Sequence, residues 1–196
     1  MRLGILGGTF DPPHSGHTEL ALFTLGEKNL DKIIFVPAFH APYPDKSAST
    51  LFEHRFTMTE IAVQEHPKFE VSGVEGERGG NSYTIDTIRH FKKEYSLSSG
   101  EIFLIVGADS FMRFDEWKDP DALLKECSVC VLKRTGIESE KFDQGYLSKV
   151  ELLDNELIEI SSSELRKRIA SESGLTNYLD ANVIEYIYRN RLYGSG

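Results

Sequence analysis

The sequence predicts an α/β fold in which helices cover both faces of a doubly wound, mostly parallel β-sheet. Short runs rich in aliphatic and β-branched residues alternate with longer amphipathic stretches, which is the pattern of β-α-β units. The run at residues 32–36 (KIIFV) is apolar after its first residue, as in strands buried on both faces. Glycines follow the runs at residues 2–6 and 101–106, at the sheet edge where such folds bind ligands. The predicted architecture is therefore Rossmann-like.

The predicted elements follow in order along the chain. We expect strands at residues 2–6, 32–36, 69–74, 101–106 and 128–133, with two further short strands at 150–153 and 157–160. We expect helices at residues 15–28, 51–65, 83–95, 109–114, 121–126, 162–170 and about 180–191. We expect a loop at 7–13, a Gly-rich turn at 76–81 and an irregular segment at 134–149.

Individual residues justify several of these bounds. The first helix has an apolar face that includes Leu20, Ala21 and Phe23, and Pro67 ends the helix predicted over 51–65. Residues 37–50 contain three prolines, many small residues and no helical period. We therefore expect a long loop there, of the class that often serves as a mobile lid.

Length and charge limit the function. The chain of 196 residues suits one domain over 1–196, with a Rossmann-like core over about 1–160 and a small helical appendage over about 161–196. Its net charge of −9 disfavours nucleic acid and acidic membranes as partners, because phosphate contacts need clustered cations. No apolar run reaches ten residues and no signal-peptide pattern opens the chain, so we expect a cytoplasmic protein. The sequence leaves a homo-oligomer open.

Cys127 and Cys130 have the C-x-x-C spacing of redox pairs and zinc sites. They fall in an apolar β-like run, without a second such pair and with none of the six histidines nearby in the sequence. Residues three apart on a strand point to opposite faces, so these thiols cannot share a disulfide or a metal. We predict two buried structural thiols, against the alternative of a redox or zinc module.

The most informative segment reads GGTFDPPHSGH over residues 7–17. Its glycine pair, with unrestricted φ angles, lets backbone N–H groups approach an anion, and the helix start adds N–H donors and a positive dipole end. His14 and His17 lie on one face of the first helical turn, with Gly16 leaving room between them. Together these features predict a phosphate cradle with two imidazole donors, distinct from Walker A and G-x-G-x-x-G loops.

Two alternatives stand beside this interpretation. Histidines near a helix start are often simple surface residues, although a pair beside two glycines at a strand end is less typical of that role. Asp11, His14 and His17 could instead form a zinc site, since histidines three apart can share a metal. The Gly-rich anion loop disfavours the zinc site.

A second helix start lies at residues 160–166 (ISSSELR). Ser161 and Glu164 have the spacing of a capping box, and the neighbouring hydroxyl and N–H groups are further donors. Arg166, one turn into the helix, can reach back to the same anion. Two such helix starts at one sheet edge could hold a polyphosphate from both sides.

Further candidates lie at the ends of later strands. Asp109 could accept hydrogen bonds from ribose hydroxyls or only cap the following helix. Trp117 could stack on a flat ring, although the core is the favoured place for it. Residues 82–84 (SYT) open a helix with N–H and hydroxyl donors. Lys133 and Arg134 end a predicted strand and are either cations at the ligand-binding edge of the sheet or an ordinary surface pair.

Residues 7–17 resemble the signature of the H-x-G-H nucleotidyltransferase superfamily. The segments that are similar to its nicotinate-nucleotide adenylyltransferases are SYTIDT at 82–87, GAD at 107–109, Trp117, Lys133–Arg134, residues 160–166, Tyr178–Leu179 and the stretch from Tyr186 to Gly194. The resemblance therefore spans nearly the whole chain.

The resemblance implies transfer of the adenylyl group from ATP to nicotinate mononucleotide, giving deamido-NAD and pyrophosphate. The mononucleotide phosphate would attack the α-phosphorus of ATP in line, without a covalent intermediate. Mg²⁺ would be a cofactor carried by ATP oxygens and water, with no protein cage.

The resemblance also implies the site residues. Those implied for ATP are Gly7, Gly8, Thr9, Phe10, His14, His17, Gly107, Asp109, Ser162, Ser163 and Arg166, of which His14, His17 and Arg166 would be catalytic. Those implied for nicotinate mononucleotide are Tyr83, Thr84, Trp117, Lys133, Arg134 and Lys46.

One segment departs from the family pattern. Members usually carry a Pro-Pro-His-Lys type sequence after the second strand, whereas residues 40–46 read HAPYPDK. Lys46 or His40 could supply the basic group, and the role of this loop in holding phosphate stays open. A non-catalytic nucleotide sensor and a sister enzyme acting on phosphopantetheine are the rival functions.

Overall fold

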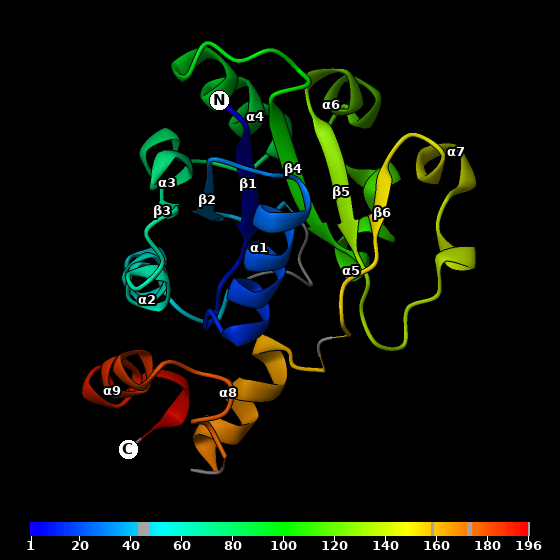
Figure 1. Ribbon diagram of the computed structural model, residues 1–196. Helices are drawn as coiled ribbons and strands as arrows, with labels where there is room; N and C mark the ends of the chain where they lie inside the picture. Colours follow the sequence, from blue (N-terminus) through cyan, green and yellow to red (C-terminus); the bar gives the residue numbers. More distant parts are fainter. Residues whose placement is uncertain (43–47, 158, 172–173, 196) are drawn as a thin grey trace.

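One parallel sheet organises the chain (Figure 1). The computed structural model describes residues 1–42, 48–157, 159–171 and 174–195. Within them, the sheet has the strand order β3-β2-β1-β4-β5-β6, and every neighbouring pair is parallel. The strands are β1 (Leu3–Gly8), β2 (Lys32–Pro37), β3 (Phe69–Val71), β4 (Ile102–Gly107), β5 (Ser128–Leu132) and β6 (Glu151–Leu153). The order reverses between β1 and β4, which is where a doubly wound fold binds its ligand.

Helices fill the connections between the strands. They are α1 (Ser15–Glu27), α2 (Phe52–Val63), α3 (Val74–Arg78), α4 (Thr84–Glu94), α5 (Ala108–Phe111), α6 (Pro120–Glu126), α7 (Gln144–Leu147), α8 (Ser162–Ala170) and α9 (Ala181–Arg189). The described 3₁₀ turns are η2 (Phe114–Glu116), η3 (Ser139–Lys141) and η4 (Leu192–Gly194). No helix within the described residues has both the length and the apolar character needed to cross a membrane.

The sheet has a hydrophobic core on each face. Successive strand residues point to opposite faces, so Ile5 packs in the core that contains Ile88 of α4, whereas Leu6 packs in the core that contains Ala21 of α1. This arrangement explains the continuously apolar strands of the sequence and confirms the predicted fold class.

A third hydrophobic cluster lies beyond the carboxyl ends of the strands. Leu165 of α8 and Val183 and Ile187 of α9 are fully buried there, together with Met58 of α2. Figure 1 shows α8 and α9 below the sheet, at the end toward which β1 points. The C-terminal helices therefore close the functional edge of the sheet.

The two cysteines confirm the prediction of structural thiols. Cys127 lies in the core on one face of the sheet and Cys130 in the core on the other, and both are free. Burial raises the pKa of Cys127 to about 12 and that of Cys130 to about 11. Both thiols therefore stay protonated and unreactive at neutral pH.

Several predicted element bounds were wrong. β1 continues through Gly7 and Gly8, where a loop was expected, because they pair with Val36 and Pro37 of β2. Residues 74–78 form α3 instead of the end of a strand and the start of a Gly-rich turn. This helix fits there because Gly79 ends it with a φ of 68°, in the region that favours glycine.

The segment between β5 and α8 also differs from expectation. Residues 134–149 contain η3 and α7, and α7 begins where the Asp143 side chain accepts a hydrogen bond from the Tyr146 N–H. The described residues of 157–160 are not a strand. There the Ile160 carbonyl accepts a hydrogen bond from the Arg134 side chain instead of from a neighbouring strand.

Part of the predicted loop at 37–50 is attached to the segment before α4. The Phe39 N–H donates to Ser82 Oγ at 2.8 Å, and the Ser82 N–H donates to the His40 carbonyl at 2.8 Å. Residues 43–47 of this loop, including Lys46, lie outside the described residues.

Gly4 and Gly26 predict opposite effects of the same substitution. A Cβ at Gly4 in β1 would lie 2.8 Å from Ile33 Cγ1 and 2.9 Å from Leu30 Cδ1, whereas a Cβ at Gly26 in α1 would meet nothing within 4 Å. We expect Gly4→Ala to lower the free energy of unfolding by about 1–3 kcal/mol through overpacking. Gly26→Ala should raise it by about 0.5 kcal/mol, since alanine favours helix. Urea denaturation measures both, and equal effects would contradict this account of β1.

Candidate active site

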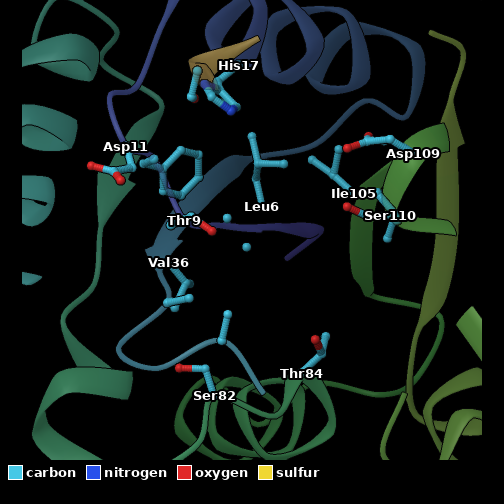
Figure 2. Close-up of a pocket in the computed structure, with 18 of the residues that line it drawn as sticks. Leu6, Thr9, Asp11, His17, Val36, Ser82, Thr84, Ile105, Asp109 and Ser110 are labelled. Atoms are coloured by element: carbon cyan, nitrogen blue, oxygen red, sulfur yellow. The ribbon is translucent and has the colours of Figure 1, made fainter. Parts of the chain in front are cut away.

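A cavity of about 360 Å³ opens where β1 and β4 end. Figure 2 shows His17 on one side of it, Ser82 and Thr84 on the opposite side, and Leu6 between them. The predicted site residues that line the cavity are Gly7, Gly8, Thr9, Phe10, His14, His17, Tyr83, Thr84, Gly107, Asp109, Trp117, Arg134, Ser162, Ser163 and Arg166. The fold thus brings together residues from six separate segments of the chain.

Of the two remaining predicted residues, one does not line the cavity and the other is not among the described residues. Lys133 is absent from its lining, and Lys133 Nζ instead pairs with Asp154 Oδ1 at 2.5 Å. Its neighbour Arg134 takes the cavity position. Lys46 lies outside the described residues, so its predicted role stays a prediction.

The glycine pair provides space at the floor of the cavity. Gly8 lies against the Phe10 ring, whose nearest atoms would be 3.0 Å from a Cβ, and a Cβ at Gly7 would meet nothing within 4 Å. Neither glycine has a positive φ. The structure therefore does not use the conformational freedom of these glycines, and what they provide is the room left beside the backbone.

The unusual backbone belongs to Phe10, which has a φ of 49°. A large side chain rarely adopts this left-handed conformation, which persists only where surrounding contacts enforce it. The Phe10 ring is 1% exposed and its centroid lies 4.9 Å from that of His17 in an edge-on contact. The strained residue thus supports one of the predicted catalytic imidazoles.

The two imidazoles stack at the start of α1. Their ring centroids are 3.8 Å apart, and the backbone N–H of His14 donates to His17 Nδ1 at 3.2 Å. Because an N–H can only donate, His17 Nδ1 is an acceptor, and neutral His17 carries its proton on Nε2. His14 Nδ1 is buried and has no hydrogen-bond partner among the described residues, which is a mark of functional sites.

Both imidazoles are neutral in the ligand-free protein. Burial lowers the pKa of His17 from 6.5 to about 3, and Arg134 lowers it further while Asp109 opposes the shift. Burial, His17 and Arg134 hold the pKa of His14 well below 6.5. Each ring therefore supplies one N–H donor without a charge until an anion arrives.

A cation and a carboxylate pair beside these rings. Arg134 Nη1 lies 3.3 Å from Asp109 Oδ1, and Arg134 Nη2 donates to the Ile160 carbonyl at 2.6 Å. Arg134 was predicted to bind the mononucleotide and Asp109 to bind ATP. The structure pairs these two side chains with each other, near the imidazoles. The ion pair fixes a guanidinium at the wall of the cavity.

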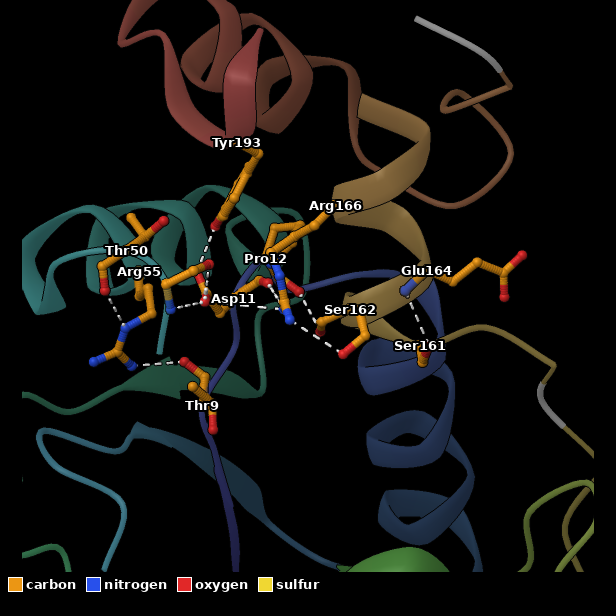
Figure 3. Close-up of polar contacts among 12 residues, drawn as sticks. Thr9, Asp11, Pro12, Thr50, Arg55, Ser161, Ser162, Glu164, Arg166 and Tyr193 are labelled. Atoms are coloured by element: carbon orange, nitrogen blue, oxygen red, sulfur yellow. Dashed lines mark hydrogen bonds and ion pairs between the residues drawn. The ribbon is translucent and has the colours of Figure 1, made fainter. Parts of the chain in front are cut away.

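The start of α8 attaches to the loop that carries the imidazoles (Figure 3). Ser162 Oγ donates to the Pro12 carbonyl at 2.9 Å, and Arg166 Nη1 donates to the Asp11 carbonyl at 2.7 Å. Ser161 Oγ accepts from the Glu164 N–H at 3.2 Å, which confirms the N-cap half of the predicted capping box. The other half was wrong, because the Glu164 carboxylate pairs with Arg168 instead of with the Ser161 N–H.

The zinc alternative at Asp11, His14 and His17 was wrong. The Asp11 carboxylate accepts hydrogen bonds from Ser49 and Tyr193, and Figure 2 shows it directed away from His17. Within the part of the chain that the structure describes, no three His, Cys, Asp or Glu side chains gather as a metal site.

The opposite end of the cavity is lined by the start of α4 and by an aromatic wall. Tyr83 is the N-cap of α4 and Thr84 its first residue. The Trp117 ring lies 5.3 Å from that of Phe114 and is half-buried while lining the cavity. Trp117 therefore combines the two roles that the sequence left open, a core contact and an exposed wall.

Sequence reasoning missed two buried charged residues at this site. Arg55 of α2 is 1% exposed and its Nη1 donates to the Thr9 carbonyl at 2.6 Å. Glu75 of α3 is 6% exposed, lines the cavity and accepts from Thr87 Oγ1 at 2.5 Å. The only signal available in the sequence concerned Arg55, an arginine among the apolar residues of the helix predicted over 51–65.

The chain is similar to known nucleotide enzymes along its length. The cytidylyltransferase-like family model matches residues 5–168. A curated protein of Thermoanaerobacter sp. (strain X514) named "Probable nicotinate-nucleotide adenylyltransferase" is 40% identical, over 98% of this chain and 94% of the relative. One of the same name from Moorella thermoacetica is 35% identical, over 98% of this chain and 91% of the relative.

A solved structure has the same fold. It is Plasmodium falciparum nicotinic acid mononucleotide adenylyltransferase complexed with NaAD, with a TM-score of 0.78 and 22% identity. The alignment covers 100% of this chain and 98% of the other. At this identity the likeness establishes the fold.

The buried imidazoles predict a pH-dependent stability. Below pH 6.5 the unfolded chain protonates both rings while the folded chain keeps them neutral, so the unfolded state binds more protons and acid destabilises the fold. The expected loss approaches about 1.4 kcal/mol per pH unit for each imidazole, measured by urea denaturation of ligand-free protein between pH 6.5 and 5. His17→Gln should reduce this slope, and His90→Gln on the exposed part of α4 should leave it unchanged. Equal slopes for both variants would contradict the assignment.

Proposed function

Because the chain belongs to the cytidylyltransferase-like family, we propose that it transfers the adenylyl group of ATP to nicotinate mononucleotide, releasing deamido-NAD and pyrophosphate. The observation that carries the proposal is that two helix starts meet at a cavity where the strand order of the sheet reverses. Relatives named for this activity align with 98% of the chain. The reaction is a step of NAD biosynthesis.

The phosphates of ATP would lie between the starts of α1 and α8. Both starts have positive dipole ends, which favour anions. At α1 the Ser15 N–H donates to the Tyr178 carbonyl at 2.8 Å, so the dipole and the side chains contribute there more than this N–H group. Ser163 and Arg166 contribute from α8, where Arg166 Nη2 donates to Ser163 Oγ at 3.1 Å. Arg134 adds a second guanidinium. These groups offset the overall negative charge of the protein at this one place.

His14 and His17 would stabilise the charge that develops during transfer. Neutral His17 presents its Nε2–H as a donor, and an arriving polyphosphate favours protonation of both rings by proximity of opposite charge. Donors that are already oriented need no reorganisation in the transition state. Gly107 and Asp109, at the end of β4, would contact the ribose of ATP.

The acceptor phosphate is already an anion, so it needs no general base. It would attack the α-phosphorus in line and displace pyrophosphate, with catalysis resting on positioning and charge stabilisation. When bound with ATP, Mg²⁺ would supply charge neutralisation for the phosphates. No group of three metal-ligating side chains occurs among the described residues to hold it.

The nicotinate ring would bind at the opposite end of the cavity. The carboxylate fits the N–H groups at the start of α4, at Tyr83 and Thr84, and Trp117 offers a face for stacking. Arg134, which lines the cavity and pairs with Asp109, would contact the phosphate of the mononucleotide. Lys46 stays a predicted phosphate ligand, and the cytoplasm stays the predicted location of the reaction.

Pyrophosphate release with a panel of acceptors tests the proposal. We expect release from ATP with nicotinate mononucleotide, and compare nicotinamide mononucleotide, phosphopantetheine and glycerol 3-phosphate. Release only with phosphopantetheine would assign the protein to a sister activity. ATP binding by calorimetry without release on any acceptor would indicate a nucleotide sensor.

Replacement of His17 tests the role of the imidazoles. We expect His17→Ala to lower kcat by about 10²–10³-fold, because its donor acts mainly on the transition state. The measurement is steady-state pyrophosphate release with saturating substrates. His90→Ala, on the exposed part of α4, is the matched control and should retain kcat. An unchanged kcat for His17→Ala would refute the assigned role.

A further inference from the structure

A buried carboxylate joins the loop that carries the imidazoles to the C-terminal turn (Figure 3). Asp11 is 2% exposed, and its Oδ1 accepts a hydrogen bond from the Tyr193 hydroxyl at 2.7 Å. Its Oδ2 accepts from the N–H and the hydroxyl of Ser49, at 2.6 and 2.7 Å. Tyr193 lies 182 residues from Asp11 in the sequence, so the end of the chain contacts the start of the site directly.

We propose that Tyr193 is a positioning residue for adenylyl transfer, whose hydroxyl acts through Asp11 to hold residues 9–14 in the conformation that presents His14 and His17. The inference rests on the proposed function for its kinetic consequence. The coupling between the C-terminal turn and the imidazoles does not depend on that function, because it is argued from the contacts of Asp11.

The first link from Asp11 to the imidazoles runs through Phe10. Its left-handed φ of 49° requires that both neighbours be held. On one side the Thr9 carbonyl accepts from Arg55 Nη1 at 2.6 Å. On the other side Asp11 is held by Ser49 and Tyr193. Because the Phe10 ring contacts the His17 ring edge-on, a change at Asp11 reaches His17.

The second link runs along the backbone to His14. Only Pro12 and Pro13 separate Asp11 from His14, and proline rings fix their own φ angles. This short connection transmits a shift of Asp11 instead of absorbing it. The carbonyls of Asp11 and Pro12 also accept hydrogen bonds from Arg166 and Ser162 of α8. The same shift would therefore alter how α8 packs against this loop.

Tyr193 is itself held in an unusual conformation. Its φ is 59° and that of Arg191 is 52°, two left-handed backbones within three residues. Such strain clusters where the surrounding structure needs a side chain in one place. Burial and the neighbouring Asp11 raise the pKa of Tyr193, so the hydroxyl keeps the proton that it donates.

A pair of tyrosine variants separates positioning from simple docking of the C-terminal helices. Tyr186 of α9 also joins the C-terminal unit to the rest of the protein, with its hydroxyl 2.9 Å from His54 Nδ1 of α2. Tyr193→Phe and Tyr186→Phe each remove one such hydroxyl and keep the ring. Only the first removes a hydrogen bond to Asp11.

The kinetic test measures pyrophosphate release from ATP and nicotinate mononucleotide, with the melting temperature of each variant measured alongside. We expect Tyr193→Phe to lower kcat by about 10–100-fold, as small misplacements of catalytic groups do, with the KM for the mononucleotide unchanged. Tyr186→Phe should retain kcat at a similar loss of melting temperature. Equal kcat values in the two variants, or a loss only in KM, would overturn the inference.

The second measurement does not depend on activity. Imidazole ¹⁵N–¹H NMR spectra of the ligand-free protein should show the His17 and His14 signals shifted in Tyr193→Phe and unshifted in Tyr186→Phe. Unshifted signals in Tyr193→Phe would overturn the coupling. Wild-type protein that is inactive on every acceptor refutes the proposed function instead, and these spectra still decide whether Tyr193 positions the imidazoles.

Discussion

The architecture of the site depends on how a strained loop between β1 and α1 is held in place. Phe10 adopts a left-handed backbone in the interior of the protein, a conformation that its neighbours must enforce. Arg55 holds Thr9, the residue before it, and Ser49 and Tyr193 hold Asp11, the residue after it. Arg55 comes from α2, and the residues that hold Asp11 come from the end of the 37–50 loop and from the C-terminal turn. The loop is therefore held by segments that are distant from it in the sequence.

The second constraint is electrostatic. The chain has a net charge of −9, yet the proposed anion site gathers helix starts, neutral imidazoles and two guanidinium groups in one cavity. The imidazoles lose their charge through burial, and Arg134 is already paired with Asp109. The ligand-free site thus limits unpaired buried charge, which would oppose folding. Part of the attraction for phosphate appears only as the anion approaches.

Much of the fold could be predicted because the signals are local. Runs such as residues 33–36 are apolar throughout. Helices alternate with these runs, and together the two define a doubly wound sheet. The end of β1 and the nature of residues 74–78 could not be predicted in this way. The bounds of β1 depend on pairing with β2, and α3 packs beside strands distant in the sequence. Propensity carries no information on either contact.

The sequence by itself determined the fold class, the helix starts at His14 and Ser161, and the residues that chemistry would require around a polyphosphate. Spacing and residue type are enough to predict the helix starts, because the groups involved lie within one turn of helix. Only the tertiary structure decided that Arg134 faces the cavity while Lys133 pairs with Asp154, and that Asp11 serves Ser49 and Tyr193 instead of a metal. Those choices rest on hydrogen bonds between segments as much as 182 residues apart, which a linear pattern cannot encode.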